Sequence, residues 1–155
     1  MEWGPRGLGN RSIIADPSDP QIMRKLNKAI KMRDFWMPFG PSMLSSRIKE
    51  YLVDGKHAPY MIQAFDTTEN RKDMIAAIHP YDFTCRPQTV DNVYNANYEK
   101  VLKSFELKTS RGVILNTSFN LHGNPIVWNP ENACYTFKNS ALDAIAIGNY
   151  LVKKN

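Results

Sequence analysis

The chain has 155 residues, of which 43% are hydrophobic, and it carries a formal net charge of +5 at pH 7. A chain of this length can bury roughly two thirds of its unfolded surface in one domain without support from metals or disulfides. No apolar run approaches the ~20 residues that span a bilayer, and the start of the chain lacks a signal-peptide pattern, so we expect a cytoplasmic protein without membrane contacts. The positive charge favours anionic partners such as nucleotides, phosphates or nucleic acid.

The two cysteines, Cys85 and Cys134, lie far apart and belong to no CxxC or Cys/His pattern. Neither a disulfide framework nor a zinc site is therefore expected. His57 and His122 have no second ligand at a metal-binding interval, so no metal site is predicted within this chain. We predict that both cysteines are reduced thiols buried in the core.

The chain opens on a glycine-rich loop, residues 4–12, that contains Arg6 and Arg11. Glycine allows tight turns and a close approach of the backbone to a ligand, and arginine can contact two phosphate oxygens at once. Because no element precedes this loop, we expect a fragment of a phosphate-handling protein. The same arginines could equally be solvated surface residues.

A first helix is predicted over residues 20–31, with Asp19 as N-cap and Pro20 at its first position. Its apolar residues recur at every fourth position and should be buried: Ile22, Leu26 and Ile30. The far end delivers Lys31 and Arg33 into a loop over 34–42. Without further information these cations could simply complement the helix dipole.

Leu44, Ile48, Tyr51 and Leu52 share a face and predict a second helix. Residues 60–65 and 74–78 are short and rich in strand-forming residues, which predicts two strands or a long hairpin. A third helix is marked by four apolar residues: Tyr98, Val101, Leu102 and Phe105.

A continuous apolar run over 112–115 predicts a buried strand that opens at Asn116 into a polar loop, a place where such folds often bind ligands. Asn129 and Pro130 repeat the cap-and-proline signal, which predicts a fourth helix to about Lys138. Its expected apolar contacts are Ala133, Tyr135 and Phe137. Residues 142–147 and 150–152 complete the chain as two strands. The pattern indicates one α/β (α+β) domain built on a mixed, twisted sheet.

Five motifs occur together and in order: 4–12 (GPRGLGNRS), 31–33 (KMR), 38–42 (PFGPS), 86–90 (RPQTV) and 116–120 (NTSFN). As a set they resemble the carbamoyltransferase family, which includes nodulation proteins and the O-carbamoyltransferases of antibiotic biosynthesis. The resemblance covers nearly the whole chain. It implies the C-terminal domain of the family, with a YrdC-like fold, whereas the N-terminal domain, which resembles actin-like ATPases and sugar kinases, is absent from this chain.

By this resemblance, the chain converts carbamoyl phosphate and ATP, with Mg²⁺, into carbamoyl-adenylate. The N-terminal transferase domain, in cis or in trans, would carry a further metal and move the carbamoyl group to a hydroxyl. The residues that match the family's catalytic positions are Arg6, Lys31 and Arg86. Those expected to bind substrate are Asn116 and Ser118 and, in the same motifs, Arg11, Arg33 and Asn120.

Some positions depart from the family pattern. Met37 stands where an arginine is common, so one phosphate contact is expected to be missing. Phe83 replaces a usual glycine and is expected to narrow the site. Gly7 and Gly40 replace alanines, which should be tolerated.

Two alternatives remain. A basic fold of this kind could be an RNA-binding module, although the chain lacks the RNP and GXXG signatures and any aromatic-basic interleaving, so nucleic acid is not the preferred partner. The departures at Met37 and Phe83 could also mark a domain with weakened catalysis that serves in assembly or regulation.

Overall fold

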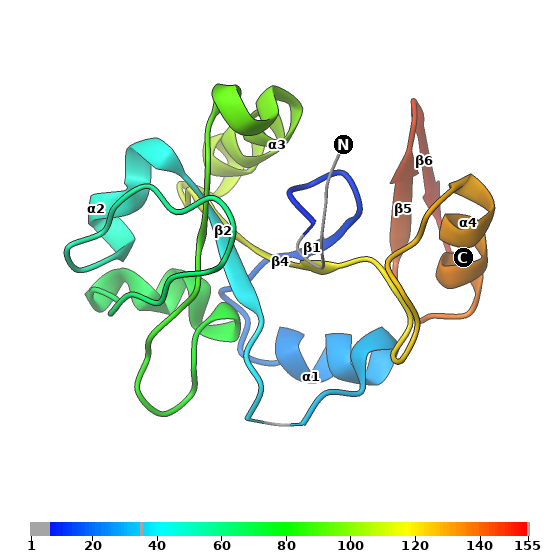
Figure 1. The fold of residues 1–155 in the computed structure, drawn as a ribbon, viewed down its shortest axis with the longest axis horizontal. Coiled ribbons are helices and arrows are strands. Elements are labelled where there is room, and N and C mark those ends of the chain that lie inside the picture. Colours follow the sequence, from blue (N-terminus) through cyan, green and yellow to red (C-terminus); the bar gives the residue numbers. More distant parts are fainter. Residues whose placement is uncertain (1–6, 35, 155) are drawn as a thin grey trace.

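The centre of the computed structural model, which describes residues 7–34 and 36–154, is a mixed four-stranded sheet with the strand order β1-β4-β2-β3 (Figure 1). β4 lies inside the sheet and pairs antiparallel with both β1 and β2, whereas β3 pairs parallel with β2. The strands are β1 (Ser12–Ala15), β2 (Gly40–Leu44), β3 (Gln88–Val90) and β4 (Val113–Ser118).

The helices flank this sheet, and a separate antiparallel hairpin closes the chain. The helical segments are α1 (Ile22–Leu26) with its π-helical continuation (Asn27–Lys31), a short 3-10 turn (Ser45–Arg47), α2 (Ile48–Tyr51), a 3-10 segment (Glu69–Ala77), α3 (Asn92–Thr109) and α4 (Pro130–Lys138). The hairpin strands are β5 (Ala144–Ile147) and β6 (Tyr150–Lys153). No helix among residues 7–34 and 36–154 is long and apolar enough to cross a membrane.

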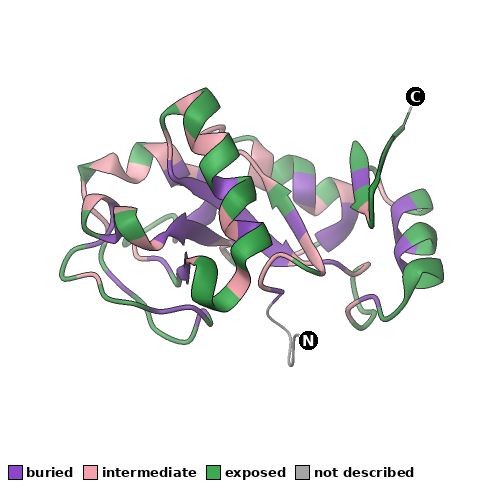
Figure 2. Ribbon diagram, turned by 90° about the horizontal axis from the view of Figure 1, so that it is seen from above, coloured by how far each residue is buried: buried purple, intermediate pink, exposed green. Residues whose placement is uncertain are grey.

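The two faces of the sheet are covered by different helices, α3 on one side and α1 on the other (Figure 1). α3 packs through Tyr98 and Leu102 onto Leu44, Val90 and Ile114, which come from three neighbouring strands. A second cluster joins α1 to the sheet and to α4 and β5, and includes Leu26, Leu115 and Phe137. A third, around Met43 and Val113, contacts α2 and the 3-10 segment. Because both faces are covered, β4 is buried over all its residues except Ser118 (Figure 2).

Most of the predicted elements are confirmed. The mixed α/β class, the buried strand that ends near Asn116, and the closing hairpin are as expected. α4 begins at Pro130 behind Asn129, whose side chain accepts a hydrogen bond from the Asn132 backbone N–H. The first helix begins at Ile22 instead of Pro20, and Ile22 itself is only partly buried.

The strands predicted over 60–65 and 74–78 are wrong. Residues 69–77 form 3-10 helix, and Phe65 makes only an isolated bridge with Cys85. Leu44 also belongs to β2 and not to a helix. The residue types in these segments are common in strands, but residues such as Met74 are buried by packing beneath the sheet and not by pairing within it.

Two burial predictions on α4 are also wrong, because Cys134 and Tyr135 are exposed. Ala133, Thr136 and Phe137 occupy the inward face of the helix, whereas Cys134 and Tyr135 lie on its outward side. Cys85, in contrast, is buried as predicted, and burial raises the pKa of its thiol to about 12.

Candidate functional site

A cavity of about 280 Å³ opens beside the carboxyl end of β4. Its walls come from segments that are far apart in the sequence, among them the glycine-rich loop, the start of β2 and the residues that precede β3. The lining residues that matter below are Gly7, Arg33, Met61, Arg86, Asn116 and Ser118. The fold therefore brings all five sequence motifs to one place.

Lys31 lies next to this cavity as a buried cation, with 4% of its surface exposed. Its Nζ donates to the Ser118 carbonyl at 2.6 Å, to Ser118 Oγ at 3.2 Å and to Asn120 Oδ1 at 2.6 Å. Burial, and then the neighbouring charge of Arg33, lower the pKa of Lys31 to about 7. The ammonium is thus well coordinated, yet it can lose its proton near neutral pH.

The backbone that positions Lys31 departs from a regular helix. After Leu26 the chain widens into a π-helical turn, closed by a hydrogen bond from the Met32 N–H to the Asn27 carbonyl at 2.9 Å. Met32 then adopts a left-handed conformation with φ 47°. The wider turn buries Lys31 together with Ile30, its neighbour in sequence. Such single π-turns are frequent at functional sites.

Arg33 lines both the first cavity and a second one of about 410 Å³, which Lys31, Met37 and Asn120 also line. Its guanidinium donates to the Pro38 carbonyl at 3.2 Å and to Thr117 Oγ1 at 3.2 Å, and lies over the Phe39 ring at 4.8 Å from the centroid. These contacts fix its position between the two cavities.

Asn116 anchors a buried polar cluster that sequence reasoning did not predict. Its Nδ2 donates to the Gly7 carbonyl at 2.8 Å, to Ser42 Oγ at 3.1 Å and to Gln88 Oε1. Gln88 Nε2 also donates to Gly7 at 3.3 Å, so two side chains from the sheet hold the glycine-rich loop. Asn116 Oδ1 is buried and has no hydrogen-bond partner among the residues that the structure describes.

Arg86 differs from these residues because its side chain is exposed. It lines the first cavity, and it makes no hydrogen bond or ion pair with any residue in 7–34 or 36–154. An arginine with five donors and no acceptor among the described residues can bind an anion.

The predicted site residues fall into three groups. The fold brings Lys31, Arg33, Asn116, Ser118, Asn120 and Arg86 together around the two cavities. Arg11 lines neither of these cavities and donates instead to the Val127 carbonyl at 3.3 Å. Arg6 lies outside the described residues. The catalytic and binding roles of all these residues stay predictions.

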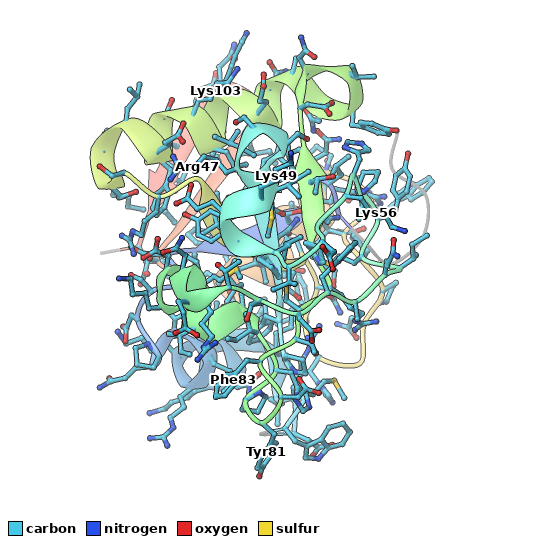
Figure 3. All side chains as sticks on the ribbon, turned by 90° about the vertical axis from the view of Figure 1, so that its left-hand side faces the viewer. Arg47, Lys49, Lys56, Tyr81, Phe83 and Lys103 are labelled. Carbon is cyan, nitrogen blue, oxygen red and sulfur yellow. The ribbon has the colours of Figure 1, made fainter. Side chains whose placement is uncertain are left out.

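The two departures from the family pattern have different consequences. Met37 lines the second cavity beside Lys31 and Arg33. Phe83 does not line the first cavity, so the expectation that it narrows the site is wrong. Its φ is 59°, which explains why glycine suits this position, and its ring lies against Arg71 at 4.8 Å. Figure 3 shows Phe83 at the end of the molecule opposite α3.

Within residues 7–34 and 36–154, no three histidine, cysteine, aspartate or glutamate side chains come together in a way that could hold a metal ion. The described donor set is instead one of cations, amides and hydroxyls. Such a set suits an anion better than a divalent cation.

Comparison with known proteins identifies one family. The Carbamoyltransferase C-terminus family matches residues 1–154. The chain is 42% identical over 154 residues to the uncharacterized protein MJ1058 of Methanocaldococcus jannaschii, covering 99% of this chain and 25% of that protein. It is 38% identical over 156 residues to the nodulation protein NolO of Bradyrhizobium diazoefficiens, covering 99% of this chain and 28% of NolO. The chain thus spans about a quarter of the length of these curated relatives.

Proposed function

The chain belongs to the carbamoyltransferase family as its C-terminal domain, and from this premise we propose that it forms carbamoyl-adenylate from carbamoyl phosphate and ATP. The relatives are several times longer than this chain, and we propose that the additional part of such a protein transfers the carbamoyl group to a hydroxyl acceptor. The cytoplasm, expected from the sequence, is the proposed place of action.

The observation that carries the proposal is the convergence of cations on one small cavity. Arg33 and Arg86 line it, and Lys31 is hydrogen-bonded to Ser118 at its edge. The guanidinium of Arg86 lacks a partner among the described residues. A cavity of about 280 Å³ with these charges suits a small phosphorylated substrate.

The proposed reaction has two steps. Water first cleaves carbamoyl phosphate into carbamate and inorganic phosphate. A carbamate oxygen then attacks the α-phosphorus of ATP, the bond from that phosphorus to the bridging oxygen breaks, and pyrophosphate leaves. The second step brings two anions together and builds charge on the phosphoryl oxygens, so fixed cations nearby lower its barrier.

In this reaction each site residue has a proposed role. Arg86 and Lys31 stabilise the phosphoryl charge, and we assign Arg6 the same role from the sequence motif. Ser118 and Asn116 orient the carbamoyl group, and no protein nucleophile is needed. Mg²⁺ would be held by the phosphates of ATP, since the described part of the chain offers no carboxylate cluster for it.

Release of pyrophosphate tests this proposal. The chain, supplied with ATP, Mg²⁺ and carbamoyl phosphate, should release pyrophosphate only when both substrates are present. Arg86→Ala should reduce this rate about 100- to 1,000-fold, the usual effect of losing one preorganised donor to a developing anion. Arg24→Ala on the exposed surface of α1 is the matched control and should keep the rate. A chain that binds neither substrate would overturn the proposed function.

A further inference from the structure

Three aromatic rings form an exposed cluster that the site described above does not use. Tyr60 and Tyr94 meet edge to face, with centroids 5.9 Å apart and planes at 80°. His57 lies 5.0 Å from Tyr94 on another side. Tyr60 is 51% exposed and Tyr94 is 41% exposed, so both rings present surface to a ligand.

The cluster is held rigidly by β3 and the residue that follows it. Thr89 N–H donates to the Ala58 carbonyl at 3.0 Å, and the Ala58 N–H donates to Thr89 Oγ1 at 2.8 Å, which fixes the segment that carries His57 and Tyr60. Asp91 caps α3 and accepts a hydrogen bond from the Tyr94 backbone N–H at 3.3 Å. Because the backbone that carries the rings is fixed in this way, a flat ligand that stacks on them has only side-chain rotamers to order.

The sequence neighbours of two of the rings lie at or next to the lining of the first cavity. Met61, which lines that cavity, directly follows Tyr60 in the chain. Asn95, which directly follows Tyr94, donates from Nδ2 to the Leu8 carbonyl at 2.8 Å, next to the cavity-lining Gly7. Arg86 and Thr89 are three residues apart along nearly extended chain, a span of about 10 Å. A nucleotide with its phosphates near Arg86 can extend its base over such a distance.

We propose that Tyr60 and Tyr94, backed by His57, form the subsite for the purine base of ATP. This inference rests on the proposed function, because it takes the phosphates to lie in the cavity. Aromatic side chains bind bases by stacking on their π-faces, and an edge-to-face pair offers one ring for the face of the base and another for its edge.

The test compares ATP with inorganic tripolyphosphate, which has the phosphates without the base. Dissociation constants for both are measured by calorimetry, with Mg²⁺ present, on the full chain and on four variants. The unmodified chain should bind ATP about 5- to 150-fold more tightly than tripolyphosphate, the usual range for one base on an aromatic ring. Tyr94→Leu should remove most of this advantage and leave tripolyphosphate binding unchanged.

Two controls make the result specific. Tyr94→Phe keeps the ring and should keep the advantage of ATP. Tyr135→Leu changes a more exposed tyrosine on α4, away from the cluster, and should have no effect. Circular dichroism of each variant excludes a general loss of folding.

The outcomes separate this inference from the function on which it rests. A chain that binds no ATP and releases no pyrophosphate overturns both. If pyrophosphate is released but Tyr94→Leu and Tyr60→Leu leave the ratio of the two dissociation constants unchanged, the inference alone is wrong. The rings would then serve a different contact, such as one with another domain.

Discussion

Two cations of the site, Lys31 and Arg86, are held in opposite ways. Lys31 is buried, and its ammonium donates to three oxygens of Ser118 and Asn120. Arg86 is exposed at the cavity and makes no hydrogen bond or ion pair with the described part of the chain. One cation is therefore part of the folded framework, whereas the other is left for a ligand.

Because of this difference, we expect substitution of Lys31 to affect both folding and chemistry, and substitution of Arg86 to affect chemistry alone. A buried lysine can change its charge, and burial has already lowered the pKa of Lys31 to about 7. A guanidinium stays charged at any working pH, so Arg86 supplies a constant positive charge. Substitutions at the two positions should consequently affect different measurements.

The largest expected effect comes from Lys31→Met. Pyrophosphate release should fall about 100-fold or more through loss of a cation, as for Arg86→Ala. The two variants should differ in stability, because methionine removes the Lys31 donor from the Ser118 carbonyl and leaves Asn120 Oδ1 with only the Ser118 hydroxyl, a loss of about 1–3 kcal/mol in the free energy of unfolding. Arg86→Ala should change this free energy by less than about 0.5 kcal/mol.

Urea unfolding of both variants measures this difference, with Lys28→Met as the control. Lys28 lies in the same π-helical turn but is exposed. Equal stability of Lys31→Met and Arg86→Ala would contradict the distinction between the two cations.

Asn116→Asp should lower the free energy of unfolding by about 2–3 kcal/mol. An aspartate cannot donate to the Gly7 carbonyl or to Gln88 Oε1, so buried acceptors lose their partner and face a carboxylate. The glycine-rich loop should then detach, which hydrogen exchange of its amides would reveal as faster exchange. Asn132→Asp, at an exposed position in the first turn of α4, should cause neither change.

A smaller effect is expected in proton uptake on binding. A phosphate near Lys31 favours its charged form, so carbamoyl phosphate should raise the pKa of this lysine above its value of about 7 in the free chain. At pH 8 binding should therefore take up a fraction of one proton. Calorimetry in buffers of different ionisation enthalpy measures this number, which should fall to nearly zero in Lys31→Arg.

The same pKa makes stability depend on pH. Because the pKa of Lys31 is lower in the folded chain than in the unfolded chain, the unfolded chain binds more protons above pH 7, and the free energy of unfolding should rise with pH. The raised pKa of Cys85 opposes this trend only above about pH 9. The slope between pH 7 and 9 should become flatter in Lys31→Met.

The sequence predicted those elements whose signals are local. Asn129 and Pro130 mark the start of α4, and the apolar run before Asn116 marks β4. β2 and β3 were missed because their inward side chains include Ser42 and Gln88, and because Pro41 occurs within a strand that has neighbours on both sides. Their place in the sheet depends on pairing between distant segments, which no local pattern contains.

The candidate site was likewise predicted only in part. The motifs predicted that Lys31, Ser118 and Asn120 lie together, which they do, whereas Arg11 of the same set lines neither cavity. They did not predict the π-helical turn that buries Lys31, since a fourfold apolar spacing fits an ordinary helix equally well. The polar residues Ser42 and Gln88 could have indicated the cluster around Asn116, but only if the register that pairs their two strands had been known.

The smallest expected effect is that of Phe83→Gly, which tests whether this departure from the family touches the site. Glycine relieves a left-handed conformation that costs other residues about 1–2 kcal/mol. It also loses the contact with Arg71, about 0.5–1 kcal/mol, and increases the entropy of the unfolded chain by a similar amount. These terms nearly cancel, so the free energy of unfolding should change by less than about 1 kcal/mol. Phe83→Ala loses the ring but keeps the backbone strain, and should be the less stable of the two variants. Because the ring lies outside the cavity, both variants should bind carbamoyl phosphate as the unmodified chain does, and a clear gain in affinity would mean that Phe83 restricts the site after all.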